Sequence, residues 1–170
     1  MIELIRNRRS IRKFAETKIE SEKIDLLKET VLRAPTSRNL QPCEFIFIEN
    51  KELLAQLSLA KKHGSSFLKN APLGVVVCAD SKKSDVWVED ASIASILLQF
   101  TAQSLGLGSC WIQIRNRFHE ENITSREYLG NLLRLQENIK VEAIVAIGYP
   151  GEIKEPIPSS QLINSKIITL

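Results

Sequence analysis

Histidine and cysteine are both scarce in this chain of 170 residues, which holds two histidines and three cysteines. Cys43, Cys78 and Cys110 lie more than thirty residues apart with no histidine beside them, so we expect neither a disulfide framework nor a zinc site. His63 and His119 have no Gly-x-Ser-x-Gly or similar motif to serve, which argues against a hydrolase with a Ser-His-Asp or Cys-His arrangement. This cysteine usage suits a reduced, cytoplasmic protein.

A long apolar run is missing too. The one long uncharged stretch, 91–114, contains ten Ser, Thr, Gln or Gly among its 24 residues, so we expect no membrane segment. The chain turns basic directly after Met1–Ile5, the reverse of the order in a secretory signal. Repeats, low-complexity runs and Pro/Gly-rich linkers are absent as well, which predicts a single domain over 1–170.

The positive charge is concentrated at one end. The first fourteen residues carry a net charge of +4 and the other 156 a net charge of −1. Arg8, Arg9, Arg12 and Lys13 surround Ser10, and guanidinium groups bind phosphate oxygens two at a time. A nucleic-acid surface is the alternative, but no second basic stripe or aromatic platform accompanies this cluster. The cluster therefore predicts a site for one small phosphate group.

Apolar periodicity and caps predict helices and strands in mixed order, which indicates an α+β sandwich of helices on a sheet. Ser21 is expected to cap the second helix, Asn50 to cap the third, and Gly64 to close the third. The expected helices are Glu3–Arg9, Glu22–Arg33, Lys51–Lys62, Val86–Leu105 and Ser125–Leu135, and the expected strands are Glu44–Glu49, Leu73–Ala79, Ser109–Ile114 and Val141–Tyr149.

Two apolar features exceed what a small domain needs. The helix Val86–Leu105 has no charge from Ala91 onward, so it is expected to be buried nearly all round. The extended tail Pro150–Leu170 ends in apolar residues although no groove in a small domain is available for them. A tail strand added to the sheet of a second subunit would bury both, which predicts a homodimer.

A second polar segment, 34–42, lies between a helix and a strand. It reads Ala-Pro-Thr-Ser-Arg-Asn-Leu-Gln-Pro, far richer in amides and hydroxyls than a simple turn needs. Asn39 and Gln41 offer donors and acceptors suited to the edge of a heterocycle.

Four sequence blocks follow one another along essentially the whole chain. They are Arg-Arg-Ser-Ile-Arg-Lys-Phe at 8–14, the loop 34–42, the run from Asp90-Ala91-Ser92 through 102–108 to Trp111-Ile112, and Ala-Ile-Gly-Tyr-Pro at 146–150. Together, in this order, they resemble the nitroreductase family of FMN-dependent oxidoreductases. The resemblance implies an α-β-α sandwich with a mixed, mostly antiparallel sheet flanked by helices. It also implies a homodimer that exchanges its C-terminal tails and holds FMN at the subunit interface.

The resemblance implies a role for each block. The first block would hold the FMN phosphate and ribityl chain through Arg8, Arg9 and Ser10. Arg12 would lie near the flavin N1–C2=O edge, where a cation stabilises the negative charge of the reduced ring. The loop would reach the same flavin from the partner subunit, and the backbone of 106–112, with Trp111, would pass near N5. The loop residues implicated are Pro35, Thr36, Ser37, Asn39 and Gln41.

Two departures from the family pattern matter. Relatives commonly place Lys or Arg two residues apart after the Gly-Tyr-Pro strand to complete the phosphate clamp, but here Ser159 and Gln161 stand in that stretch. They could donate neutral hydrogen bonds instead, or Lys154 or Lys166 could replace the missing cations, and we expect weaker FMN binding. Larger relatives also insert a lid where this chain has only 80–85, so an open substrate pocket is expected.

The predicted function is ping-pong hydride transfer from NAD(P)H through flavin N5 to an electron-poor acceptor such as a nitroaromatic or a quinone. No catalytic side chain and no metal are expected, since the flavin carries the chemistry. A Rossmann fingerprint is absent, because Gly106-Leu107-Gly108 follows a helix and precedes a strand. The alternative is a flavin-binding protein with another chemistry, namely reductive dehalogenation or flavin breakdown, or one without turnover.

Overall fold

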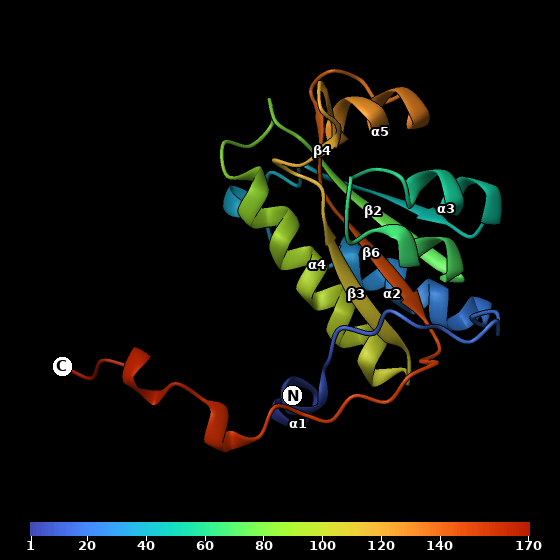
Figure 1. Ribbon diagram of the computed structural model, residues 1–170. Coiled ribbons are helices and arrows are strands. Elements are labelled where there is room, and N and C mark those ends of the chain that lie inside the picture. Colours follow the sequence, from blue (N-terminus) through green and yellow to red (C-terminus); the bar gives the residue numbers. More distant parts are fainter.

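The computed structural model describes all 170 residues and is built around a four-stranded antiparallel sheet in the order β1-β2-β6-β3 (Figure 1). The two central strands are the continuous apolar runs of the sequence, and nearly all their residues are buried, as expected for strands covered on both faces. The four strands are β1 (Cys43–Ile48), β2 (Leu73–Asp80), β3 (Gly108–Gln113) and β6 (Ile139–Gly148), and a separate hairpin consists of β4 (Phe118–Glu120) and β5 (Ile123–Thr124).

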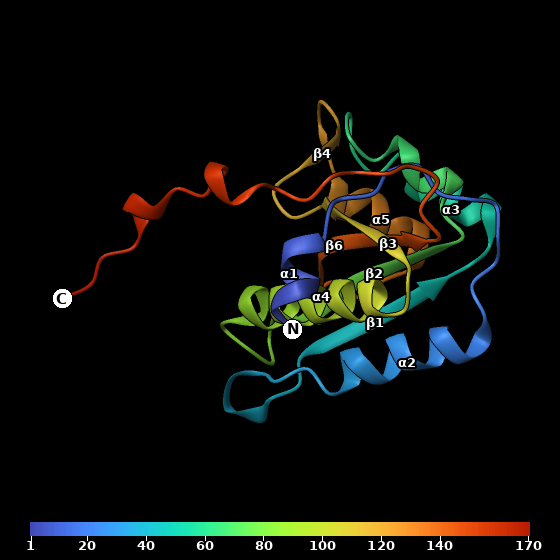
Figure 2. The ribbon, with the colours of Figure 1, turned by 90° about the horizontal axis from the view of Figure 1, so that it is seen from below.

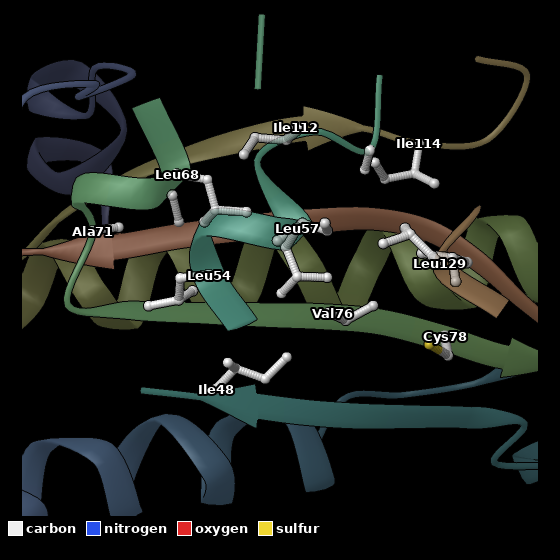
Figure 3. Packing of buried hydrophobic residues seen from close by; sticks show 14 of the residues in the cluster. Ile48, Leu54, Leu57, Leu68, Ala71, Val76, Cys78, Ile112, Ile114 and Leu129 are labelled. Atoms are coloured by element: carbon white, nitrogen blue, oxygen red, sulfur yellow. The ribbon is translucent and has the colours of Figure 1, made fainter. Parts of the chain in front are cut away.

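Helices cover both faces of the sheet, with α2 and α4 on one side and α3 and α5 on the other (Figure 2). Each face has its own apolar core, and Figure 3 shows the one under α3, where Leu54 and Leu57 pack toward Val76. The predicted α-β-α sandwich is therefore confirmed, although the only parallel pairing within the chain is an isolated bridge between Ser10 and Ser109. The helices are α1 (Ile2–Asn7), α2 (Ser21–Leu32), α3 (Lys51–Leu57), α4 (Trp87–Ser104) and α5 (Ser125–Leu133).

Helix ends agree with the sequence in part. The Asn50 side chain accepts a hydrogen bond from the Leu53 N–H at 2.8 Å, which confirms the cap of α3. The predicted cap at Ser21 is wrong, because α2 begins at Ser21 itself and the Ser21 hydroxyl lies 3.3 Å from a carboxylate oxygen of Glu22. The helix α3 ends at Leu57, well before Gly64, because the Ser58 hydroxyl donates to the Ala55 carbonyl and the chain turns away.

The helix α4 is not buried all round within one chain. Ala91, Leu98 and Ala102 are buried in the core that α4 shares with α2 and the sheet, while Ile93 and Ile96 are 40% and 37% exposed. The prediction that this helix is buried nearly all round therefore does not hold within one chain, and Ile93 and Ile96 form an exposed apolar strip on the outer side of α4.

The tail leaves the sheet and projects away from it, with two short 3-10 turns (Figures 1 and 2). Its apolar side chains are exposed: Ile153, Ile157, Leu162, Ile163, Ile167, Ile168 and Leu170. An arm of this kind gains no burial from its own chain. None of the helices has both the length and the apolar character that crossing a membrane would require.

Candidate functional site

The basic segment after α1 lies against the beginning of β3. The Ile11 N–H donates to the Ser109 carbonyl at 3.0 Å, and Ser10 is bridged to Ser109. A Cβ at Gly108 would lie 2.9 Å from the Ile11 Cβ, so only glycine permits this approach. Ile11 is buried, which fixes the register of the segment and hence the positions of the neighbouring Arg and Ser side chains.

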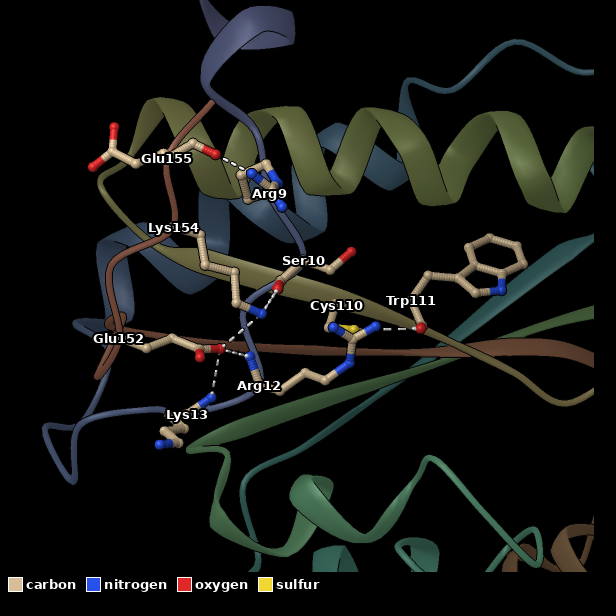
Figure 4. Close-up of polar contacts among 9 residues, drawn as sticks. All are labelled: Arg9, Ser10, Arg12, Lys13, Cys110, Trp111, Glu152, Lys154 and Glu155. Carbon is tan, nitrogen blue, oxygen red and sulfur yellow. Dashed lines mark hydrogen bonds and ion pairs between the residues drawn. The ribbon is translucent and has the colours of Figure 1, made fainter. Parts of the chain in front are cut away.

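The first residues of the tail return to this segment (Figure 4). The Glu152 carboxylate accepts hydrogen bonds from the N–H groups of Arg12 at 2.6 Å and Lys13 at 3.2 Å. The Lys154 ammonium donates to the Ser10 carbonyl at 2.8 Å and pairs with Glu152 at 3.2 Å. The N–H of Arg12, more than any other group, lowers the pKa of Glu152 below its usual range.

Four cations therefore gather around Ser10, and we call Arg8, Arg9, Arg12 and Lys154 the cation cluster. The Arg9 guanidinium donates to the Glu155 carbonyl, and the Arg12 guanidinium lies 5.9 Å from the centre of the Phe67 ring. Arg8 is half-buried, yet its side chain has no hydrogen bond or ion pair within the chain. A cavity of about 250 Å³ opens beside Arg9 and Lys154. An unpartnered, half-buried guanidinium next to other cations fits a bound anion.

The polar loop 35–41 is held in place from the start of α4. Its Ser37 N–H donates to Asp90 Oδ1 at 2.8 Å, and the Ser84 hydroxyl donates to Asp90 Oδ2 at 3.1 Å. Asp90 is 2% exposed, so both contacts are shielded from water. Asp90 makes no ion pair with an arginine and is not at an exposed helix end. It anchors the loop.

The same loop is conformationally strained. Arg38, Asn39 and Gln41 have φ values of 53°, 53° and 48°, a region that side chains other than glycine rarely occupy. The Thr36 hydroxyl accepts from the Gln41 N–H at 3.0 Å and stabilises the turn. Strain of this kind concentrates at binding sites, where the surrounding contacts hold an unfavourable backbone in place. Asn39 and Gln41 are exposed, and the Gln41 side-chain amide donates to the Asn39 side-chain oxygen at 3.3 Å, which leaves their other polar groups available to a ligand.

The loop and the cation cluster lie at opposite ends of α4 (Figure 1). Asp90 is in the first turn of this 18-residue helix, while the cavity beside the cluster is lined by Gln103 and Gly106 at its other end. An α-helix of that length is about 27 Å long. The predicted residues therefore form two separate groups in one chain.

The third predicted group lies on β3, at the edge of the sheet. Trp111 is half-buried, and its indole N–H donates to the Gln113 side chain at 3.0 Å. Burial raises the pKa of the neighbouring Cys110 thiol. Because β3 begins beside Ser10, a ligand held by the cation cluster has this strand edge next to it.

Comparison with known proteins identifies the family. The family model described as "Nitroreductase family" matches residues 5–62 and 55–149. The chain belongs to the nitroreductase family. A protein of Archaeoglobus fulgidus that carries the provisional name NADH dehydrogenase/NAD(P)H nitroreductase is 37% identical over an alignment of 158 residues, which covers 91% of this chain and 87% of that protein. The FMN reductase (NADPH) of Bacillus subtilis is 26% identical over 92% of this chain and 68% of its own.

Solved structures of the nitroreductase family agree with this fold. The structure of an FMN-dependent nitroreductase from Clostridium difficile R20291 superposes with a TM-score of 0.97 at 45% identity, covering 99% of this chain and 98% of that one. Ser159 and Gln161, which the sequence suggested for the phosphate site of this chain, lie in an exposed turn of the projecting tail and do not join the cation cluster. Lys154 does join it, whereas Lys166 lies in a further exposed turn of the same tail.

The contact between Glu152 and the segment 12–13 predicts a pH-dependent stability. Since the folded pKa of Glu152 is lowered, its carboxylate stabilises the fold above its ordinary pKa, and this contribution is lost as the pH falls through the lowered value. We expect Glu152→Gln to lower Tm at pH 7 by about 3 °C, the shift for about 1 kcal/mol in a domain of this size.

Thermal unfolding followed between pH 3 and pH 7 measures this contribution. The gap between Glu152→Gln and the parent protein should narrow steadily below about pH 4. Glu155→Gln is the matched control, since the Glu155 side chain makes no contact and only its carbonyl accepts from Arg9. A gap that is constant with pH, or an equal loss in the control, would contradict the role of Glu152.

The cysteines are expected to be inert in the folded protein. Burial, reinforced by Asp90, raises the pKa of Cys43 to about 11, and burial raises that of Cys78 to about 12. A thiol with a pKa of 11 is only about 0.1% thiolate at pH 8. Ellman's reagent at pH 8 should therefore label the native protein at least about tenfold more slowly than the urea-unfolded chain. Rapid labelling of native Cys43 would show that its side chain is more accessible than the structure indicates.

Proposed function

We propose that this protein is an FMN-dependent oxidoreductase that passes hydride from NAD(P)H to an electron-poor acceptor such as a nitroaromatic or a quinone. The supporting relatives include proteins named FMN-dependent nitroreductase and FMN reductase. The observation that carries most weight is the unpartnered, half-buried Arg8 within the cation cluster, since a guanidinium in that setting needs an anion.

The residues of this chain fit the phosphate group of FMN. Arg8 offers a free guanidinium, and the Ser10 hydroxyl lies beside the Cys110 thiol, with which it interacts. Lys154 and Arg9 add positive charge beside them, with Lys154 held by Ser10 and Glu152. Charged donors of this kind bind a dianion far better than neutral hydroxyls do. Ser10 and Ser109 are adjacent, so the bound group would continue along the edge of β3.

When bound, FMN supplies a ring that accepts hydride from one partner and gives it to another. The chain contributes position and charge. The Arg12 guanidinium is exposed next to Phe67 and stabilises negative charge that develops beside it. Trp111 and the backbone of β3 line one edge of the site. Only residues 81–86 separate β2 from α4, so no lid encloses the acceptor, and a broad acceptor range follows.

The complete site requires two copies of the chain. The loop 35–41 is anchored at Asp90, and Gln103, which lines the cavity beside the cation cluster, lies thirteen residues and about 20 Å further along α4, so the two groups do not meet within one chain. In a two-fold dimer with α4 packed against α4, the loop of one chain lies beside the cluster of the other. The exposed Ile93 and Ile96 supply an apolar contact for that packing, and the projecting tail supplies an arm.

A spectrum of the purified protein tests this function. The protein, loaded with FMN if needed, should show a flavin spectrum that bleaches on addition of NAD(P)H under nitrogen and returns when a quinone is added. A protein that takes up no FMN would rule out the proposal. A flavoprotein that dithionite bleaches and NAD(P)H does not would point instead to a flavin protein with another chemistry.

A further inference from the structure

A second cavity, of about 460 Å³, lies at the far end of β3. The side chains around it come from the beginnings of α4, α5 and β6, the segment that follows β3 and the hairpin of β4 and β5, which gather at the same end of the sheet (Figure 1). Four of its lining residues are cations and two are aromatic, and none is acidic. They are Ser81, Trp87, Ile114, Arg115, Asn116, Arg117, Phe118, Thr124, Arg126, Lys140 and Val141.

The four cations of this cavity have no ion pair in the chain. Arg117 donates only to the carbonyl of the adjacent Asn116, and Lys140 donates to the Glu137 carbonyl. Arg126 donates to the Gln136 and Glu137 carbonyls, and its Nε is buried without a partner.

Carboxylates close to these cations are few. Glu142 and Glu127 are near enough to Arg115 and Arg126 to interact with them electrostatically, but neither lines the cavity. Like charges gathered around one hollow are unfavourable unless an anion binds there.

The position of the cavity relates it to the proposed flavin site. Ser109 lies beside the cation cluster, and Ile114 directly follows β3 and lines the second cavity. Five residues of extended strand separate them, about 17 Å. The cavity therefore lies at the end of the strand along which we propose that the flavin ring binds. A nicotinamide nucleotide whose nicotinamide contacts that ring would place its other half in this cavity.

We propose that this cavity binds the adenosine phosphate half of the reductant and selects NADPH over NADH. The proposal rests on the proposed function. Trp87 and Phe118 offer aromatic surface for adenine, and the Arg and Lys side chains offer donors for phosphate. In dinucleotide-binding sites of the Rossmann type, a carboxylate accepts the ribose hydroxyl of NADH, whereas an arginine accommodates the extra phosphate of NADPH, and the same chemistry applies to any site for these nucleotides. This cavity offers arginines and no carboxylate.

Steady-state kinetics with both nucleotides tests the selection. The parent protein should use NADPH with a kcat/KM at least about tenfold above that for NADH at low ionic strength, the effect of one charge-assisted contact. The double variant Arg115→Ala/Arg117→Ala should bring this ratio close to one, because both side chains are exposed and hold no other element in place. The competitive inhibition constant of adenosine 2′,5′-bisphosphate should rise in the variant by about the same factor.

Lys18→Ala is the matched control, since Lys18 is an exposed cation that lines a different cavity together with Glu16 and Glu49. Its ratio should equal that of the parent protein, and unfolding curves should show that all variants are folded. A parent protein that prefers NADH, or a ratio unchanged in the double variant, overturns this inference and leaves the proposed function standing. Failure of both nucleotides to bleach the bound flavin overturns the proposed function, and this inference with it.

Discussion

Replacing Arg8 with glutamate is expected to raise the Kd for FMN at least about a hundredfold, the equivalent of about 3 kcal/mol. The change removes a charge-assisted hydrogen bond to the phosphate and puts a negative charge next to the dianion. The Arg8 side chain makes no hydrogen bond or ion pair within the chain, so the loss reports on ligand binding rather than on the fold. Quenching of flavin fluorescence during titration of the apoprotein measures it.

Arg6→Glu controls for the change in net charge. Arg6 is exposed on α1 and pairs with Glu3, so the substitution alters the same end of the chain without touching the cation cluster. We expect the Kd of this variant for FMN to rise by less than about threefold, because salt screens the interaction of an exposed charge with a distant phosphate. If the two variants bind FMN equally well, the phosphate does not lie at Arg8.

Replacing Asp90 with alanine is expected to release the loop 35–41 and to weaken FMN binding about tenfold. Asp90 is buried and accepts from both the Ser37 N–H and the Ser84 hydroxyl, so its loss leaves two donors without a partner. Each orphaned buried donor costs about 1–3 kcal/mol, and the strained backbone at Arg38 and Asn39 loses its anchor. In urea titrations, the free energy of unfolding should fall by at least the cost of one such donor, about 1–3 kcal/mol.

Asp85→Ala is the control, because Asp85 also contacts this loop through an ion pair with Arg38, but in full exposure. Exposed ion pairs contribute little, so this variant should keep its stability within about 0.5 kcal/mol and its FMN affinity within about twofold. Equal effects of the two substitutions would mean that the buried contact to Ser37 does not position the loop.

Local patterns in the sequence predicted the fold well. The apolar run 73–79 became the buried strand β2, and Asn50 became the cap of α3, because both depend on residues close together in the chain. The prediction that Ser21 caps the second helix was wrong because the sequence does not fix a helix start to the residue. The helix α2 begins at Ser21, one residue earlier than predicted, and Glu20 stands at its N-cap position.

Contacts between residues that lie far apart in the sequence could not be predicted from it. Nothing near Glu152 in the sequence shows that it binds the backbone of Arg12, and nothing near Asp90 shows that it anchors Ser37. The second cavity could not be predicted either, because its four cations are spread between Arg115 and Lys140 and form no basic run in the sequence. The family resemblance implied that the loop and the basic segment reach one flavin from different subunits, and the structure places these two segments at opposite ends of α4 within one chain.

Complementation between two variants that bind FMN weakly tests most directly whether one site is built from two chains. Arg8→Glu removes the cluster but keeps the loop, and Asp90→Ala disturbs the loop but keeps the cluster. When the two are unfolded together, refolded as an equal mixture and titrated with FMN, about a quarter of the sites should regain the parent affinity, because each mixed dimer contains one intact cluster facing one intact loop. A mixture that binds FMN no better than the average of the two separate variants would contradict the shared site.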